Sequence, residues 1–193
     1  MASGAIIIVI GGVRSGKTSW CENQAIHLSQ KTNRRLVYIA SGAAFDDEMK
    51  KRISRHKEDR IHFEWITIEQ PVDLFSCTKK LHEGDIVLWD CVTTWLTNEL
   101  ILPRGNSEAW TDHTELARIY NELVHFVEWA KKHLHTCFII SNEVLGEDVF
   151  TEGLTAIYQQ MTGELHQWLV TNSQAAIEME AGLALVRKGE WQT

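Results

Sequence analysis

The sequence has few prolines, no paired cysteines and no long apolar run, and each shortage excludes a class of protein. Only two prolines occur among 193 residues, which argues against long structureless linkers. None of the four cysteines forms a C-x-x-C pair, so we expect small buried thiols in a reducing cytoplasm. Residues 1–10 lack a basic segment before a short apolar run, and no segment approaches a membrane span. We therefore expect neither a signal peptide nor stable membrane insertion.

Positive charge is also in short supply. The chain has 19 Lys and Arg against 26 Asp and Glu, a formal net charge of −7. This balance argues against a nucleic-acid binder, which would need a basic face. Hydrophobic residues make up 44% and charged residues 23%, as in ordinary soluble globular proteins. The length predicts one α/β domain over residues 1–193.

The sequence does contain a complete phosphate-binding loop, G-x-x-x-x-G-K-[ST], after the apolar run Ala5–Ile10. Lys17 can reach the terminal phosphates of a nucleotide, and the Thr18 hydroxyl can bind Mg²⁺. The alternative is a glycine-rich turn with a surface lysine, but a strand before the loop and a helix after it favour a nucleotide site. The predicted nucleotide contacts are Gly11, Gly12, Val13, Arg14, Ser15, Gly16, Lys17 and Thr18.

Apolar strands alternate with helical segments along the chain, which predicts a mainly parallel sheet flanked by helices on both faces. The expected strands are Ile6–Ile10, Leu36–Ala40, Phe63–Thr67, Ile86–Asp90 and Cys137–Ser141, with a terminal antiparallel pair at Ala175–Met179 and Leu183–Val186. The expected helices are 16–30, 46–60, 71–82, 93–100, 112–134 and 153–171, with a loop at 103–107.

Polar residues follow several of these strands at their carboxyl ends, where ligands bind in parallel sheets. Asp90 ends an apolar strand, the usual place of the acid that positions Mg²⁺ in P-loop enzymes. Its alternative role is a helix cap or a solvated strand end. We take Thr18 and Asp90 as the predicted Mg²⁺ ligands. The histidines show no convincing metal-ligand spacing, so we predict no structural zinc.

His56 lies in a segment of alternating charges. Arg52 and His56 are four residues apart and would share one helix face. A neutral imidazole among cations is suited to attack a polyphosphate, and the cations favour the neutral form. From the residues alone, however, alternating charges favour an ordinary solvated helix face.

Together these segments resemble the bifunctional adenosylcobinamide kinase / adenosylcobinamide-phosphate guanylyltransferase family of cobalamin biosynthesis. The resemblance runs in order over nearly the whole chain, and it implies a P-loop NTPase (RecA-like) architecture. The loop G-G-x-R-S-G-K and the block D-D-E-M…R-I-x-x-H are the most specific parts. The matching segments are Gly11–Thr18, Tyr38–Ser41, Asp46–Met49, Arg52–His56, Trp65–Glu69, Asp90–Asn98, Ser141–Val144 and Ala181–Leu183.

The resemblance implies two reactions. A nucleoside triphosphate, GTP or ATP, phosphorylates adenosylcobinamide. GTP then transfers GMP to a histidine, which passes it to adenosylcobinamide phosphate to give adenosylcobinamide-GDP. The guanylylated histidine corresponds to His56, with Lys17 as the other catalytic residue. A homotrimer is also implied. Further nucleotide contacts correspond to Ser41, Gly42, Ala43, Lys57, Arg60, Glu69 and Asp90.

Departures from the family pattern gather in residues 145–167. The usual G-x-G-I-V-P stretch appears as Leu145–Phe150, and R-x-F-R-D appears as Ala156–Gln160. These changes motivate an alternative, a P-loop small-molecule kinase that has lost guanylyl transfer. A third reading is a nucleotide-binding assembly protein without catalysis, against which Lys17, Thr18 and Asp90 argue.

Overall fold

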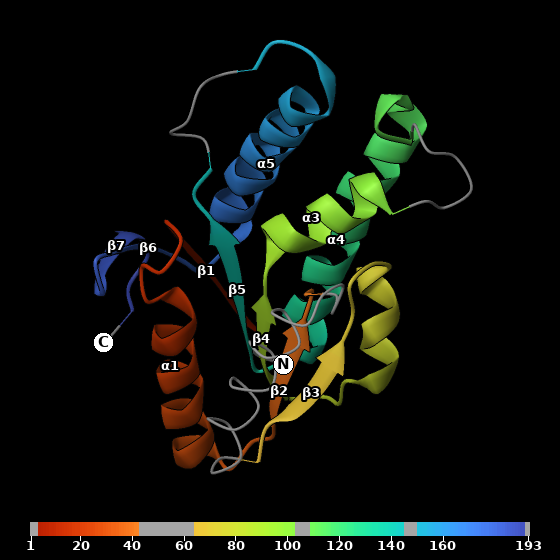
Figure 1. The fold of residues 1–193 in the computed structure, drawn as a ribbon. Helices are drawn as coiled ribbons and strands as arrows, with labels where there is room; N and C mark the ends of the chain where they lie inside the picture. Colours follow the sequence, from red (N-terminus) through yellow and green to blue (C-terminus); the bar gives the residue numbers. More distant parts are fainter. Residues whose placement is uncertain (1–3, 43–63, 103–108, 145–149, 192–193) are drawn as a thin grey trace, which may run out of the picture.

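A seven-stranded sheet forms the centre of the molecule. The computed structural model describes residues 4–42, 64–102, 109–144 and 150–191 (Figure 1). The strands lie in the order β3-β2-β4-β5-β1-β6-β7. All neighbouring pairs are parallel except β6 and β7, which are antiparallel. The strands are β1 (Ala5–Gly11), β2 (Leu36–Ala40), β3 (Ile66–Glu69), β4 (Ile86–Asp90), β5 (Thr136–Asn142), β6 (Ala175–Glu180) and β7 (Leu183–Lys188).

Helices cover both faces of the sheet, as the sequence predicted. Alternate residues of β1 show why, because Ile6 and Ile8 pack in one core cluster while Ile7 and Val9 pack in the other. Helix α1 lies over the second cluster, and α3, α4 and α5 lie over the first (Figure 1). A strand buried on both faces needs a continuous apolar run, which is what β1 has. The helices are α1 (Lys17–Thr32), α3 (Val92–Ile101), α4 (His113–His133) and α5 (Gly153–Asn172), with 3-10 helices at Leu74–Lys80 and Ala109–Thr111.

Two predicted elements differ from the observed ones by more than two residues at one end or in type. Strand β3 begins at Ile66 and runs to Glu69, later than predicted, because Glu64 has a left-handed backbone conformation with φ 52° that no strand residue adopts. The helix predicted at 71–82 is a 3-10 helix, and it also follows a left-handed residue, Asp73. The predicted helix 46–60 and loop 103–107 lie outside the described residues.

The carboxyl ends of the central strands meet at one edge of the sheet. Gly11 of β1 is the register partner of Asn142 in β5, and Ala40 of β2 is the partner of Asp90 in β4. The predicted β6–β7 hairpin reaches the same edge, where its turn residue Gly182 donates a backbone hydrogen bond to the carbonyl of Ser15 at 3.0 Å. The candidate site therefore has contributions from both ends of the chain. No helix within the described residues is both long and apolar enough to cross a membrane.

Candidate nucleotide site

The predicted phosphate-binding loop joins β1 to α1, and two of its glycines are required by the backbone. A Cβ atom on Gly11 would clash with the carbonyl oxygen of Met179 in the neighbouring β6. Gly16, directly before α1, has φ 92°, a conformation that disfavours any residue with a side chain. The loop therefore takes its shape from a close strand contact at one end and a left-handed residue at the other.

Lys17 holds its ammonium group inside this loop. Its Nζ donates to the carbonyl oxygens of Gly11 at 2.8 Å and Gly12 at 2.7 Å, and lies 3.5 Å from Ser15 Oγ. The side chain is buried, and burial lowers its pKa, while the nearby Cys91 and Asp90 oppose that change. The Lys17 ammonium group thus lies where the backbone amides of the loop and the start of α1 already favour an anion.

Thr18 and Asp90, which are 72 positions apart in the sequence, are brought into contact. The Thr18 hydroxyl donates to Asp90 Oδ2 at 3.0 Å. The Tyr38 hydroxyl from β2 donates to the same oxygen at 2.7 Å. Hydroxyl and carboxylate oxygens are the hard donors that Mg²⁺ prefers, so the pair fits this ion. In the described parts of the chain no three His, Cys, Asp or Glu residues cluster as metal ligands, so other ligands would come from phosphates and water.

Ser41, Gly42 and Glu69 follow β2 or end β3 at the same sheet edge. Ser41 is fully buried, and its Oγ accepts a hydrogen bond from Trp89 Nε1 at 2.8 Å. Its backbone N–H donates to the carbonyl of Asp90 at 2.9 Å. Ser41 thus connects β2 to β4, while Gly42 is half-buried and Glu69 is exposed. Their contacts with a nucleotide stay predictions.

Comparison with known proteins identifies the family. A family model described as cobinamide kinase / cobinamide phosphate guanyltransferase matches residues 7–186. The chain belongs to the cobinamide kinase / cobinamide phosphate guanyltransferase family. It is 30% identical over 185 residues to the bifunctional adenosylcobalamin biosynthesis protein CobP of Pseudomonas aeruginosa, covering 95% of this chain and 97% of that protein. It is 27% identical over 184 residues to CobU of Escherichia coli, covering 93% of this chain and 98% of that protein.

Solved structures confirm the P-loop NTPase (RecA-like) fold. The flagellar accessory protein FlaH from Methanocaldococcus jannaschii superposes with a TM-score of 0.54 at 13% identity, covering 100% of this chain and 84% of that one. The ATPase domain of another protein gives a TM-score of 0.52 at 10% identity, covering 96% of this chain and 77% of that one. At this identity the likeness concerns the fold alone.

Three residues of this cobinamide kinase family member join the site although no role was predicted for them. Tyr38 contacts Asp90 as described above. Asn142, at the end of β5, donates through Nδ2 to Thr93 Oγ1 at 2.9 Å, and Cys91 lies 3.3 Å from the same Thr93 hydroxyl. All of these positions are near or just after the carboxyl end of a strand, and that place in the sequence is the signal that points to them.

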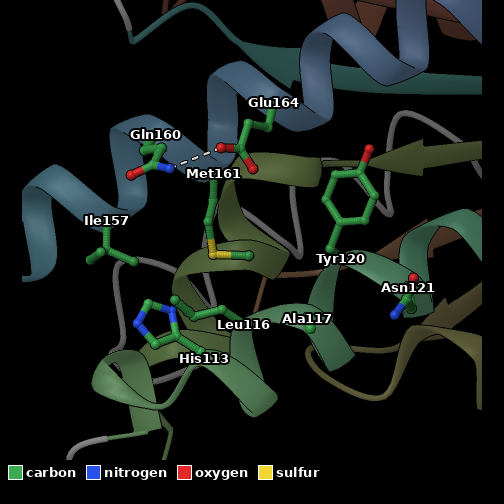
Figure 2. Close-up of a pocket in the computed structure, with 9 residues that line it drawn as sticks. All are labelled: His113, Leu116, Ala117, Tyr120, Asn121, Ile157, Gln160, Met161 and Glu164. Carbon is green, nitrogen blue, oxygen red and sulfur yellow. Dashed lines mark hydrogen bonds between the residues drawn. The ribbon is translucent and has the colours of Figure 1, made fainter.

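The structure has two cavities of interest, one beside the phosphate-binding loop and one beside the segment that departs from the family pattern. One, of about 390 Å³, borders the phosphate-binding loop at Gly11 and Gly12 and extends along β6. The other, of about 400 Å³, lies between α4 and α5. Figure 2 shows Gln160, which donates to Glu164 at 2.9 Å, in the wall formed by α5. This wall belongs to the segment that departs from the family pattern.

Among the remaining predicted site residues, Val13 is 74% exposed and Arg14 has a left-handed backbone with φ 60°, whereas four others are not described. Ala43, His56, Lys57 and Arg60 all lie within residues 43–63, outside the described part of the chain. Their roles stay predictions that rest on the sequence and on the family resemblance.

Proposed function

We propose that this chain catalyses both reactions for which its family is named: phosphorylation of adenosylcobinamide, and guanylyl transfer from GTP to the product. The family match over residues 7–186 supports this assignment. The contact between Thr18 and Asp90 beside the buried Lys17 is the single structural observation that carries the nucleotide half of it. The comparisons give no support to a kinase that has lost the second reaction.

In the kinase step, the acceptor hydroxyl oxygen of adenosylcobinamide forms a bond to the γ-phosphorus. The bond from that phosphorus to the β–γ bridging oxygen breaks, the nucleoside diphosphate leaves, and the hydroxyl proton passes to solvent. Lys17 stabilises the charge that develops on the transferred phosphoryl group and the leaving oxygen. Thr18 and Asp90 would hold Mg²⁺, which when bound neutralises phosphate charge.

In the guanylyl-transfer reaction, a ring nitrogen of His56 attacks the α-phosphorus of GTP and pyrophosphate leaves. A phosphate oxygen of adenosylcobinamide phosphate then attacks the same phosphorus and releases the histidine. Two displacements through a phosphoramidate divide one difficult transfer into two easier steps. The cationic residues near His56 in the sequence, Arg52, Lys57 and Arg60, would favour the neutral imidazole and attract polyphosphate. The resemblance to the family supports His56 as the nucleophile.

Labelling with GTP tests the guanylyl-transfer step. After incubation with GTP labelled at the α-phosphate, we expect one acid-labile GMP on each wild-type chain, detected by scintillation counting and by intact mass. His56→Ala should carry no label, because the nucleophile is gone. His27→Ala removes a histidine of α1 and should be labelled like the wild type.

A second experiment, with GTP labelled at the γ-phosphate, separates the two reactions. A preparation that moves the γ-phosphate to adenosylcobinamide but never acquires GMP would restore the kinase-only alternative. Loss of label in His27→Ala but not in His56→Ala would place the nucleophile elsewhere. Measuring both labels in the same preparation ensures that an inactive sample is not mistaken for either result.

We further propose a homotrimer that works in the cytoplasm with Mg²⁺ and GTP or ATP. The family resemblance supports the trimer. The four cysteines, all free and buried, are compatible with a reducing compartment.

A further inference from the structure

We propose that Tyr38 is a positioning residue for the metal site: its hydroxyl holds the Asp90 carboxylate in the orientation that Mg²⁺ binding requires. This inference rests on the proposed function, because it takes Thr18 and Asp90 as the residues that bind Mg²⁺. It goes further by assigning a role to a β2 side chain that lies outside the phosphate-binding loop and, in this proposal, does not bind the metal itself.

The hydrogen bonds of Asp90 carry the first step. Tyr38 and Thr18 both donate to Oδ2, at 2.7 Å and 3.0 Å. Both side-chain donors therefore bind the same carboxylate oxygen. Among the described residues no other side-chain donor to Asp90 is seen, which leaves Oδ1 for the ion or for a water molecule bound to it. Two donors on one oxygen fix the rotation of the carboxylate about its own axis. A hydrogen bond to an ionised acceptor is about twice as strong as a neutral one.

The packing of the Tyr38 ring carries the second step. The residue is only 6% exposed, and its ring meets that of Trp65 edge to face, with centroids 6.3 Å apart. Strands β2 and β4 are hydrogen-bonded neighbours, and Tyr38 is paired with Leu88, two residues before Asp90. The sheet and the ring contact together fix the hydroxyl before any ligand arrives. Thr18, by contrast, is itself a predicted metal ligand, so only the Tyr38 hydroxyl can be removed without removing a ligand as well.

The substitution Tyr38→Phe tests this role, because it removes the hydroxyl and keeps the ring against Trp65. We expect the Mg²⁺ concentration for half-maximal enhancement of binding of a fluorescent GTP analogue to rise about tenfold, the lower end of the loss seen when residues that orient metal ligands are changed. Binding of the same analogue in EDTA should be unchanged. The ratio of the two affinities is a readout that a merely structural defect would not move.

Tyr120→Phe, which removes a hydroxyl from α4 near the second cavity, is the matched control and should titrate like the wild type. An unchanged Mg²⁺ titration in folded Tyr38→Phe would overturn the proposal. Equal loss of binding with and without Mg²⁺ would overturn it too, because it would show that Tyr38 supports the whole loop. If the wild type binds the analogue equally well with and without Mg²⁺, the assignment of Thr18 and Asp90 as metal ligands would be refuted, and the positioning role of Tyr38 with it.

Discussion

At the residue scale, a few buried polar side chains hold the site edge of the sheet together. His166 of α5 is an example, because it is 6% exposed and its Nε2 lies 2.7 Å from Ser141 Oγ at the end of β5. Burial lowers the pKa of His166, and the charge of Glu143 partly opposes that change. The folded protein thus keeps a neutral imidazole next to β5, the strand between β1 and β4.

This lowered pKa predicts acid sensitivity. Between the folded-state pKa and the unfolded-state value of about 6.5, the unfolded chain binds more protons, so stability falls as the pH decreases through this window. His166→Gln should cost about 1 kcal/mol above the window, through the altered hydrogen bond to Ser141. It should lose less stability on acidification than the wild type.

Urea unfolding of both proteins at a series of pH values measures this effect. The difference in unfolding free energy between the two proteins should stay constant above the window and narrow as the pH falls through it. A difference that does not change across the window would mean that His166 contributes nothing to the acid sensitivity.

At the element scale, one arginine joins α3 to α4. Arg118 of α4 donates to Glu99 of α3 at 2.9 Å and to Glu115 and Glu122 of its own helix at 2.8 Å each. The Glu99 side chain is fully buried, and it also accepts from the backbone N–H of Asp73, before the 3-10 helix, at 2.6 Å. This network sets the position of α3, which begins shortly after Asp90.

Arg118→Met should therefore destabilise the protein by about 2 kcal/mol, because the buried Glu99 carboxylate loses its cation. The figure is below that for fully buried pairs, since the arginine side chain itself is 32% exposed and water screens it. Chemical denaturation gives the value.

Arg187→Met is the control for this prediction, because Arg187 is 62% exposed and its partner Glu178 is 46% exposed. An exposed pair of this kind is worth less than about 1 kcal/mol. Equal effects of the two substitutions would show that Arg118 contributes no more than a surface charge.

At the scale of the whole molecule, the sheet and its helices enclose all four thiols. Cys21, Cys77 and Cys137 are 0% exposed and Cys91, beside the nucleotide loop, is 5% exposed. Burial raises the pKa of each, that of Cys77 to about 12. Thiols of this kind react only when the structure opens.

We therefore expect the thiols of the native protein to react slowly with Ellman's reagent, and all four to react in denaturant. Cys91, the least buried, should react first, so Cys91→Ser should remove the fastest phase. A rapid stoichiometric reaction of the native wild type, or a fastest phase that persists in Cys91→Ser, would contradict the burial described here.

How much could be predicted from the sequence depended on how far apart the interacting residues are. The loop from Gly11 to Thr18 is contiguous, so its motif was recognisable, and the strands Leu36–Ala40 and Ile86–Asp90 were predicted to the residue because they are almost wholly apolar. The start of β3 was missed because a left-handed Glu64 leaves no mark in hydrophobic periodicity.

The sequence by itself determined the type of site, because a phosphate loop and a strand-ending acid are local patterns with a direct physical meaning. Only the tertiary structure decided which distant residues contact the residues of the site. Tyr38 reaches Asp90 across 52 positions, and Gly182 reaches Ser15 from the other end of the chain. Such contacts follow from the strand order, and strand order is set by long-range packing of the whole sheet, which no local pattern specifies.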